Sequence, residues 1–259
     1  MKKLFLAMAF MSMAILGVSA QNIQFHYDLG SALYHSGYKS ERFTRPNITT
    51  TVEMFKPDKW GNTFFFIDMN YGKVSAPYSA DGLSDGGVLG SYWEISRELR
   101  LARSPFLAHI EYDGGMDHYS GSYDDAWLCG VTYAMASKDF SKTFSLTAMY
   151  KAIPRNLKTV HNFQVTAVWN VLFLHNRFKF DGFLDFWKEN RPWQHPKGSF
   201  SGDGTDYILL SEPQIWYNLN TIKGMEGVNL SIGSEIEISN NFCGYGMYVN
   251  PTLAMKWTF

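Results

Sequence analysis

Polar and apolar residues alternate along most of this chain, and this period of two constrains its fold more than any other feature. Successive side chains of a β-strand point to opposite faces, so each alternating stretch predicts a strand with one apolar and one polar face. In residues 161–174, for example, Phe163 and Val165 share one face while Gln164 and Thr166 share the other. A face that apolar must lie against a protein core or against lipid.

The same alternation predicts twelve strands, an even number that is typical of bacterial outer-membrane barrels. We expect the strands near residues 23–36, 46–56, 62–74, 88–101, 105–114, 125–136, 140–152, 161–174, 177–188, 206–219, 227–239 and 246–259.

The connections between these strands alternate in length. Short ones are expected at residues 57–61, 102–104, 137–139 and 175–176, and long ones at residues 73–87, 115–124, 153–160 and 189–205. Short turns at one end and long loops at the other are typical of an outer-membrane barrel. The connection at residues 218–226 is longer than this scheme prefers.

Composition narrows the remaining classes. The chain is 46% hydrophobic and 18% charged, which excludes disorder, and its net charge of -1 gives no electrostatic basis for binding nucleic acid. After residue 20, no apolar stretch approaches the roughly 18 residues that a spanning helix needs. The sequence therefore predicts an all-β fold, a single 12-stranded antiparallel transmembrane β-barrel. A soluble sandwich or lipocalin-like fold is the alternative, because alternation alone does not say which face meets lipid.

The first twenty residues have the features of a secretory signal peptide. Lys2 and Lys3 supply the positive start, residues 4–18 are apolar but too short to span, and small residues precede Gln21. We expect residues 1–20 to be cleaved and residues 21–259 to form the barrel in the outer membrane of a Gram-negative bacterium.

The chain ends on an aromatic residue that closes an alternating strand. Met255, Trp257 and Phe259 stand at every second position. This ending resembles the assembly signal of outer-membrane barrels, which implies the barrel assembly machinery as a partner through Phe259. The lipid bilayer and lipopolysaccharide are the expected surroundings.

If the apolar faces meet lipid, the polar faces line a lumen. Three successive predicted strands place aromatic rings beside ionisable groups on that face, an arrangement suited to stacking a planar ring and binding its hydroxyls. The candidate lumen residues are Phe64, Phe66, Asp68 and Asn70, then Glu94, Ser96 and Glu98, then His109, Glu111 and Asp113.

Two segments within this region carry a family resemblance. Residues 60–72 (WGNTFFFIDMNYG) and 91–99 (SYWEISREL) resemble the conserved segments of the Tsx-like nucleoside-specific channels of the outer membrane. Their short, uncharacterised Bacteroidetes branch is the most similar. The resemblance implies a twelve-stranded barrel with a narrow lumen and successive weak nucleoside sites. It carries over to Phe64, Phe66, Asp68 and Glu94.

The predicted function is therefore passive, selective uptake of small solutes, with nucleosides expected from the resemblance. Seven residues are predicted to contact the solute: Phe64, Phe66, Asp68, Asn70, Glu94, His109 and Glu111. Transport requires no cofactor, and no catalytic residue is predicted. Cys129 and Cys243 are expected to be unpaired thiols, and no cysteine or histidine pair has the spacing of a zinc site.

Two rival functions stay open. A barrel enzyme is the first: His109, Glu111 and Asp113 alternate on one face as in a peptidase site, and two His and Ser pairs resemble those of lipid A deacylases. Those pairs are His35 with Ser36 and His118 with Ser120. The second is a barrel plugged by its own side chains, in which interior charges neutralise each other, for instance Glu53 or Asp185 with Lys179 or Arg177.

Overall fold

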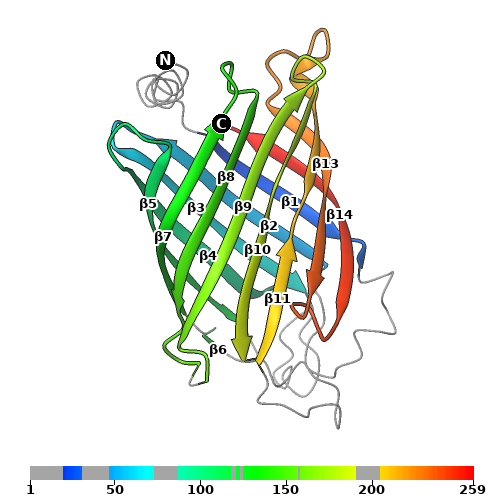
Figure 1. Ribbon diagram of the computed structural model, residues 1–259. Helices are drawn as coiled ribbons and strands as arrows, with labels where there is room; N and C mark the ends of the chain where they lie inside the picture. Colours follow the sequence, from blue (N-terminus) through cyan, green and yellow to red (C-terminus); the bar gives the residue numbers. More distant parts are fainter. Residues whose placement is uncertain are drawn as a thin grey trace.

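The computed structural model describes residues 20–30, 47–72, 87–117, 121–122, 125–156, 158–190 and 205–259. It is a closed, antiparallel β-barrel of twelve strands, which confirms the predicted fold class (Figure 1). Among the described residues, no helix is both long and apolar enough to cross a membrane.

The strands follow the predicted order along the chain. Their bounds are β1 (Ala20–Asp28), β2 (Ile48–Pro57), β3 (Gly61–Gly72), β4 (Gly87–Arg100), β5 (Phe106–Asp117), β6 (Gly121–Ser122), β7 (Ala126–Ala136), β8 (Lys142–Ala152), β9 (His161–Phe173), β10 (Phe178–Asn190), β11 (Thr205–Ser211), β12 (Gln214–Asn218), β13 (Leu230–Asn240) and β14 (Met247–Thr258). The short β6 lies off the ring and pairs only with β5.

Pairing of the first and last strands closes the ring. β1 pairs with β2 on one side and with β14 on the other, where Asn22 lies opposite Thr258. The backbone N–H of Phe259 donates to the carbonyl of Gln21 at 2.9 Å, so the two ends of the barrel wall lie side by side. Every described strand of the ring is therefore paired on both sides, which is what a sheet within lipid requires.

The predicted strand at residues 206–219 is interrupted. Its halves, β11 and β12, both pair with β10 and with β13, so together they fill one position in the ring. Pro213 has no N–H to donate, and Gly182 on β10 has a φ of 145°. A Cβ atom on Gly182 would lie 2.4 Å from the carbonyl oxygen of Glu212. The break therefore depends on a close approach that only glycine permits.

Other differences from the predicted bounds are small. β1 begins at Ala20 rather than residue 23 and ends at Asp28, and the last part of that predicted strand, residues 31–36, lies outside the described residues. β13 begins at Leu230 rather than residue 227, after the longer connection in which η2 (Leu219–Thr221) lies.

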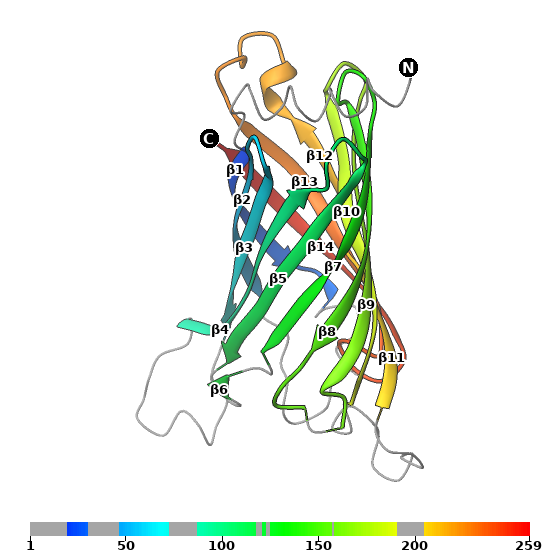
Figure 2. The same cartoon turned by 60° about the vertical axis from the view of Figure 1, so that its left-hand side comes forward.

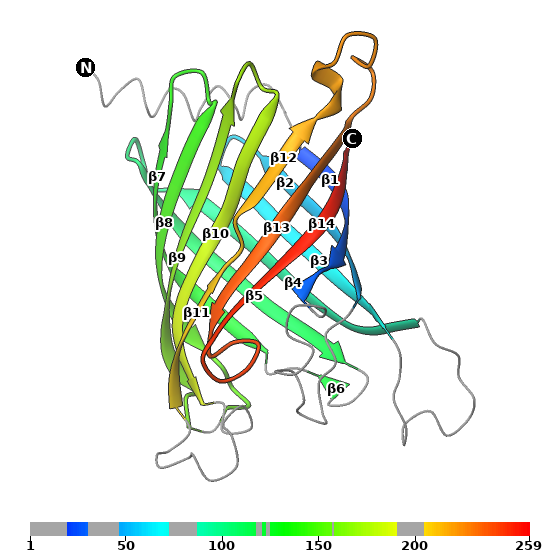
Figure 3. The same cartoon turned by 90° about the vertical axis from the view of Figure 1, so that its right-hand side faces the viewer.

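The short connections lie at the same end of the barrel as the C-terminus (Figures 2 and 3). The turn between β9 and β10 shows how they are built: His175 and Asn176 have φ values of 58° and 61°. A tight hairpin with two central residues at positive φ matches the right-handed twist of its strands. Antiparallel pairing then places the other strand ends, such as Ala152 of β8 opposite His161 of β9, at the far end of the barrel.

The distribution of exposed side chains identifies the lipid-facing surface. On β14, Leu253 and Met255 are 59% and 49% exposed, whereas Asn250 and Lys256 are 0% and 5% exposed. A water-soluble fold buries apolar residues and exposes polar ones, so this pattern is inverted. The outer wall is apolar and the lumen polar, which is the arrangement of a transmembrane barrel.

Candidate functional site

The strand register places the predicted lumen residues of β3, β4 and β5 on one continuous surface. Phe66 lies opposite Glu94, and Glu94 lies opposite Asp113. One step toward the short-turn end, Phe64 and Glu111 flank Ser96 in the same way. We call this surface the β3–β5 wall; it comprises Phe64, Phe66, Tyr92, Glu94, Ser96, Glu98, His109, Glu111 and Asp113.

Aromatic rings form a run along this wall. The ring centroids of Phe64 and Phe66 are 6.0 Å apart, and those of Phe66 and Tyr92 are 5.9 Å apart. The Tyr92 hydroxyl donates to Oε1 of Glu94 at 2.7 Å. Tyr92 was not among the predicted site residues, although its place two positions before Glu94 puts it on the same face of the strand.

Three carboxylates converge beside the rings. One oxygen from each of Glu94, Glu111 and Asp113 lies within 4.8 Å of the others. Two basic side chains contact this group among the described residues. One is His109, and the other is Lys151 on β8, whose Nζ is 3.5 Å from Oδ2 of Asp113 and donates to Gln164 at 2.7 Å. Sequence pattern alone did not indicate Lys151, because the pairing depends on the shear of the barrel.

His109 links this group to a further carboxylate. Its Nδ1 is 3.3 Å from Glu98, and its Nε2 is 3.2 Å from Glu111. Glu98 also accepts hydrogen bonds from Thr132 at 2.6 Å and from Asn62 at 2.7 Å. Because both ring nitrogens face carboxylate oxygens, the imidazole acts here as a bridge between two acids.

Asp68 and Asn70 lie further toward the long-loop end and do not join the carboxylate group. The hydroxyl of Thr51 donates to Asp68, and that of Thr49 donates to Asn70 at 2.8 Å. Of the seven predicted solute-contacting residues, the structure therefore brings five together on the β3–β5 wall: Phe64, Phe66, Glu94, His109 and Glu111.

The other side of the lumen carries charges that are matched. Lys179 lies 2.5 Å from Asp181, and Lys256 lies 3.7 Å from the same carboxylate. His26 is 3.7 Å from Glu235. We call this surface the β10–β1 wall; it comprises Lys179, Asp181, Gln214, Trp216, Glu235, Lys256 and His26.

Of the two carboxylates suggested for Lys179, Asp185 is wrong, because it accepts from Thr166 while Lys179 pairs with Asp181, two residues along the same strand. Glu53, the other suggested carboxylate, does interact electrostatically with Lys179. Cys129 and Cys243 form no disulfide, as expected. The four residues of the His and Ser pairs, His35, Ser36, His118 and Ser120, lie outside the described residues, as does most of the predicted signal peptide.

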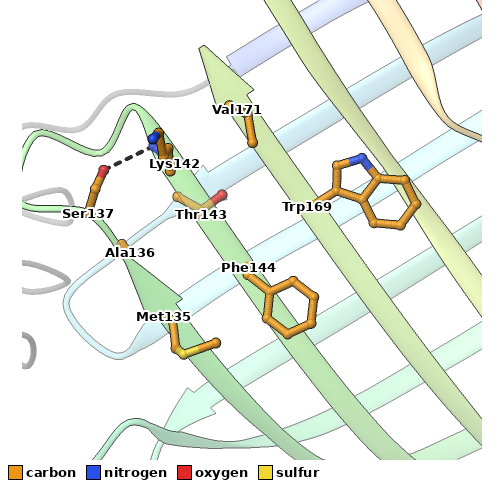
Figure 4. A pocket seen from close by; sticks show the side chains of 8 residues that line it. All are labelled: Met135, Ala136, Ser137, Lys142, Thr143, Phe144, Trp169 and Val171. Carbon is orange, nitrogen blue, oxygen red and sulfur yellow. Dashed lines mark hydrogen bonds between the residues drawn. The ribbon is translucent and has the colours of Figure 1, made fainter. Parts of the chain in front are cut away.

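A shallow hollow on the outer wall is a different feature. It has a volume of about 310 Å³ and lies among the short-turn ends of β7, β8 and β9 (Figure 4). Outward-facing Met135, Phe144 and Trp169 supply much of its lining. These side chains share the lipid-facing surface, and none of the residues that line the hollow belongs to the β3–β5 wall.

Comparison with known proteins supports the fold. Residues 20–259 match a family model described as "Domain of unknown function (DUF5020)". No curated protein matches the chain. A solved NanC porin is similar at a TM-score of 0.52 and 9% identity, over 92% of this chain and all of that one (100%).

Two more distant channels are also similar. OpdQ of Pseudomonas aeruginosa has a TM-score of 0.40 at 9% identity, with 83% of this chain and 56% of that chain covered. The outer membrane channel DcaP of Acinetobacter baumannii has a TM-score of 0.40 at 10% identity, with 93% and 96% covered. The resemblance to Tsx-like channels stays a prediction.

Proposed function

The chain belongs to the DUF5020 family, and on the basis of its structure we propose that it is a passive outer-membrane channel for small solutes. The observation that carries the proposal is the inverted polarity of a closed barrel, apolar outside and polar inside. Such a wall is stable in lipid and offers water and polar solutes a lined path. The likeness to a NanC porin supports the same reading of the fold.

The width of the ring fits a selective channel. Twelve strands enclose a lumen wider than that of filled eight-stranded barrels and narrower than that of the 16–18-stranded porins. A small solute would pass close to the wall. Each contact must be weak, because a tightly bound solute leaves slowly and blocks the next one.

The β3–β5 wall suggests which solutes pass most readily. Its rings, spaced about 6.0 Å apart at Phe64 and Phe66, present successive apolar surfaces on which a planar ring can stack. The neighbouring carboxylates of Glu94 and Glu111 accept hydrogen bonds from hydroxyl groups. We therefore propose planar ring compounds that carry hydroxyls, with nucleosides as the test case.

Liposome swelling tests the proposal. Purified barrel in liposomes should admit nucleosides faster than sugars of similar mass, and the double substitution Phe64→Ala and Phe66→Ala should remove this preference. The matched control is Phe163→Ala, which removes a ring from the lipid-facing surface and should leave the preference intact. Heat-modifiable migration on a gel shows that each variant is folded.

The outcomes separate the rival functions. Swelling without any preference for nucleosides contradicts the specificity and retains the channel. No swelling with any solute favours either the barrel enzyme or the plugged barrel. The plugged barrel has its own support, because lumen side chains such as Gln24, Thr132 and Asn250 are 0% exposed.

A further inference from the structure

The carboxylate group on the β3–β5 wall carries more negative charge than its described neighbours compensate. One oxygen from each of Glu94, Glu111 and Asp113 lies within 4.8 Å of the others. Carboxylates this close repel one another when they are shielded from bulk water. Such a group either shares a proton or binds a cation. The surrounding contacts favour a bound cation over a shared proton.

The basic neighbours are already held by other partners. Lys151 is 3.5 Å from one oxygen of Asp113, but its Nζ donates to Gln164 at 2.7 Å and lies 5.0 Å from the centre of the Trp187 ring. The two ring nitrogens of His109 contact Glu111 and Glu98, so one imidazole is shared between two carboxylates. Neither group reaches Glu94 in the contacts of the described residues.

One buried oxygen indicates a further ligand. Asp113 is 5% exposed, and no donor from the described part of the chain bonds its Oδ1. A buried carboxylate oxygen without a donor is costly and requires an explanation. Asp181 also has such an oxygen, but Lys179 and Lys256 flank its other oxygen and neutralise the charge. At Asp113 the nearest groups include two more acids.

We propose that Glu94, Glu111 and Asp113 bind a divalent cation inside the barrel, with Ca²⁺ the best fit. All three ligand atoms are oxygens, which suits a hard cation rather than a zinc-type metal. Ca²⁺ binds oxygen at about 2.3–2.6 Å, so ligands on its opposite sides lie about 4.6–5.2 Å apart. The three oxygens lie within 4.8 Å of one another, close enough for a single ion to reach all of them.

Neighbouring residues support this geometry. The Tyr92 hydroxyl, which donates to Glu94 at 2.7 Å, fixes the orientation of one ligand, and His109 does the same for Glu111. Support of ligands by hydrogen-bonded neighbours is a general property of metal sites. The site requires only the β3–β5 wall, so it goes beyond the proposed transport and would exist equally in a plugged barrel.

Titration of the purified barrel in detergent tests the site without any measurement of flux. Tb³⁺ replaces Ca²⁺ in oxygen sites, and its luminescence is excited through nearby Tyr and Trp. We expect saturable luminescence that Ca²⁺ displaces, with one Ca²⁺ per barrel by calorimetry. Glu94→Gln and Asp113→Asn should each weaken Ca²⁺ binding by at least about tenfold, since loss of even an outer-sphere partner costs that much.

Glu235→Gln is the matched control, because it removes a lumen carboxylate from the β10–β1 wall and should leave the affinity within about twofold of wild type. Absence of Ca²⁺-displaceable luminescence in the wild type overturns the site. So does unchanged affinity in both amide variants, or an equal loss in Glu235→Gln, which would indicate a diffuse negative field. If either amide variant fails the heat-modifiability check, Glu111→Gln supplies the same comparison.

Discussion

The β3–β5 wall and the β10–β1 wall line the same lumen but differ in charge balance. Positive and negative groups are matched on the β10–β1 wall, whereas carboxylates are in excess on the β3–β5 wall. On the β10–β1 wall, Asp181 lies between Lys179 and Lys256, and the Lys256 ammonium lies 4.0 Å from the centre of the Trp216 ring. On the β3–β5 wall, three carboxylates meet beside aromatic rings, with Lys151 and His109 as the basic side chains in contact, and His109 is shared with the further carboxylate of Glu98. Matched charges stabilise a barrel interior, whereas an excess of one sign marks a surface that binds something else.

Removal of a charge should therefore have opposite effects on the two walls. Lys256→Met on the β10–β1 wall is expected to give the largest change, because it leaves the buried Asp181 with one lysine and breaks the contact with Trp216. Loss of one partner from a buried ion pair costs about 3–5 kcal/mol. Urea unfolding in lipid vesicles measures the loss. Stability equal to wild type would show that this wall is not held by its charges.

The reverse is expected for Glu94→Gln on the β3–β5 wall. The amide keeps an acceptor for the Tyr92 hydroxyl and removes repulsion from Glu111 and Asp113. In the presence of a chelator, we expect this variant to be more stable than wild type by about 1–4 kcal/mol, the range for one contact between like charges at about 4 Å from bulk water to a protein surface. The same unfolding assay with Ca²⁺ should reverse the order. Destabilisation in both buffers would contradict the excess of charge.

An ion pair outside the lumen gives the smallest effect and calibrates the other two. In the turn between β2 and β3, Asp58 lies 2.7 Å from Arg97 and accepts from the backbone N–H of Trp60 and Gly61. The hydrogen bond from Arg97, with those backbone donors, lowers the pKa of Asp58 from 3.8 to about 2. Asp58 is 41% exposed, so the pair contributes at most about 1 kcal/mol.

The sign of this effect follows from the lowered pKa. The charged form is favoured in the folded state, so the contribution is fully present above about pH 4 and is lost as the pH falls through about 2. Asp58→Asn should therefore be less stable than wild type at pH 7, and the two should converge near pH 2. A difference that persists unchanged at pH 2 would assign the effect to the turn's hydrogen bonds instead of the charge.

Much of the fold could be predicted because each strand of a membrane barrel alternates apolar residues that face lipid with polar residues that face the lumen. The alternation of Phe163 with Gln164 specifies a strand and its two faces, and the same rule placed Phe66, Glu94 and Glu111 in the lumen. These are local properties with a period of two, and they do not depend on the rest of the chain.

Contacts across strands could not be predicted in the same way. Lys151 reaches Asp113 from β8, and the distance between them in the sequence carries no signal of that pairing. The stagger of strands around the ring decides which lumen residues meet, and it is a property of the whole barrel. The break between β11 and β12 was missed for a related reason, since it depends on the approach of Gly182 to Glu212.

An uncompensated acidic wall along an open pore should attract cations, and the reversal potential of the barrel in a planar bilayer measures that preference. In a KCl gradient without divalent cations, we expect cation selectivity in the wild type. A combined Glu94→Gln, Glu111→Gln and Asp113→Asn variant should lose most of this selectivity and keep its conductance. A pore that prefers anions, or one whose selectivity is unchanged in that variant, would contradict such a wall.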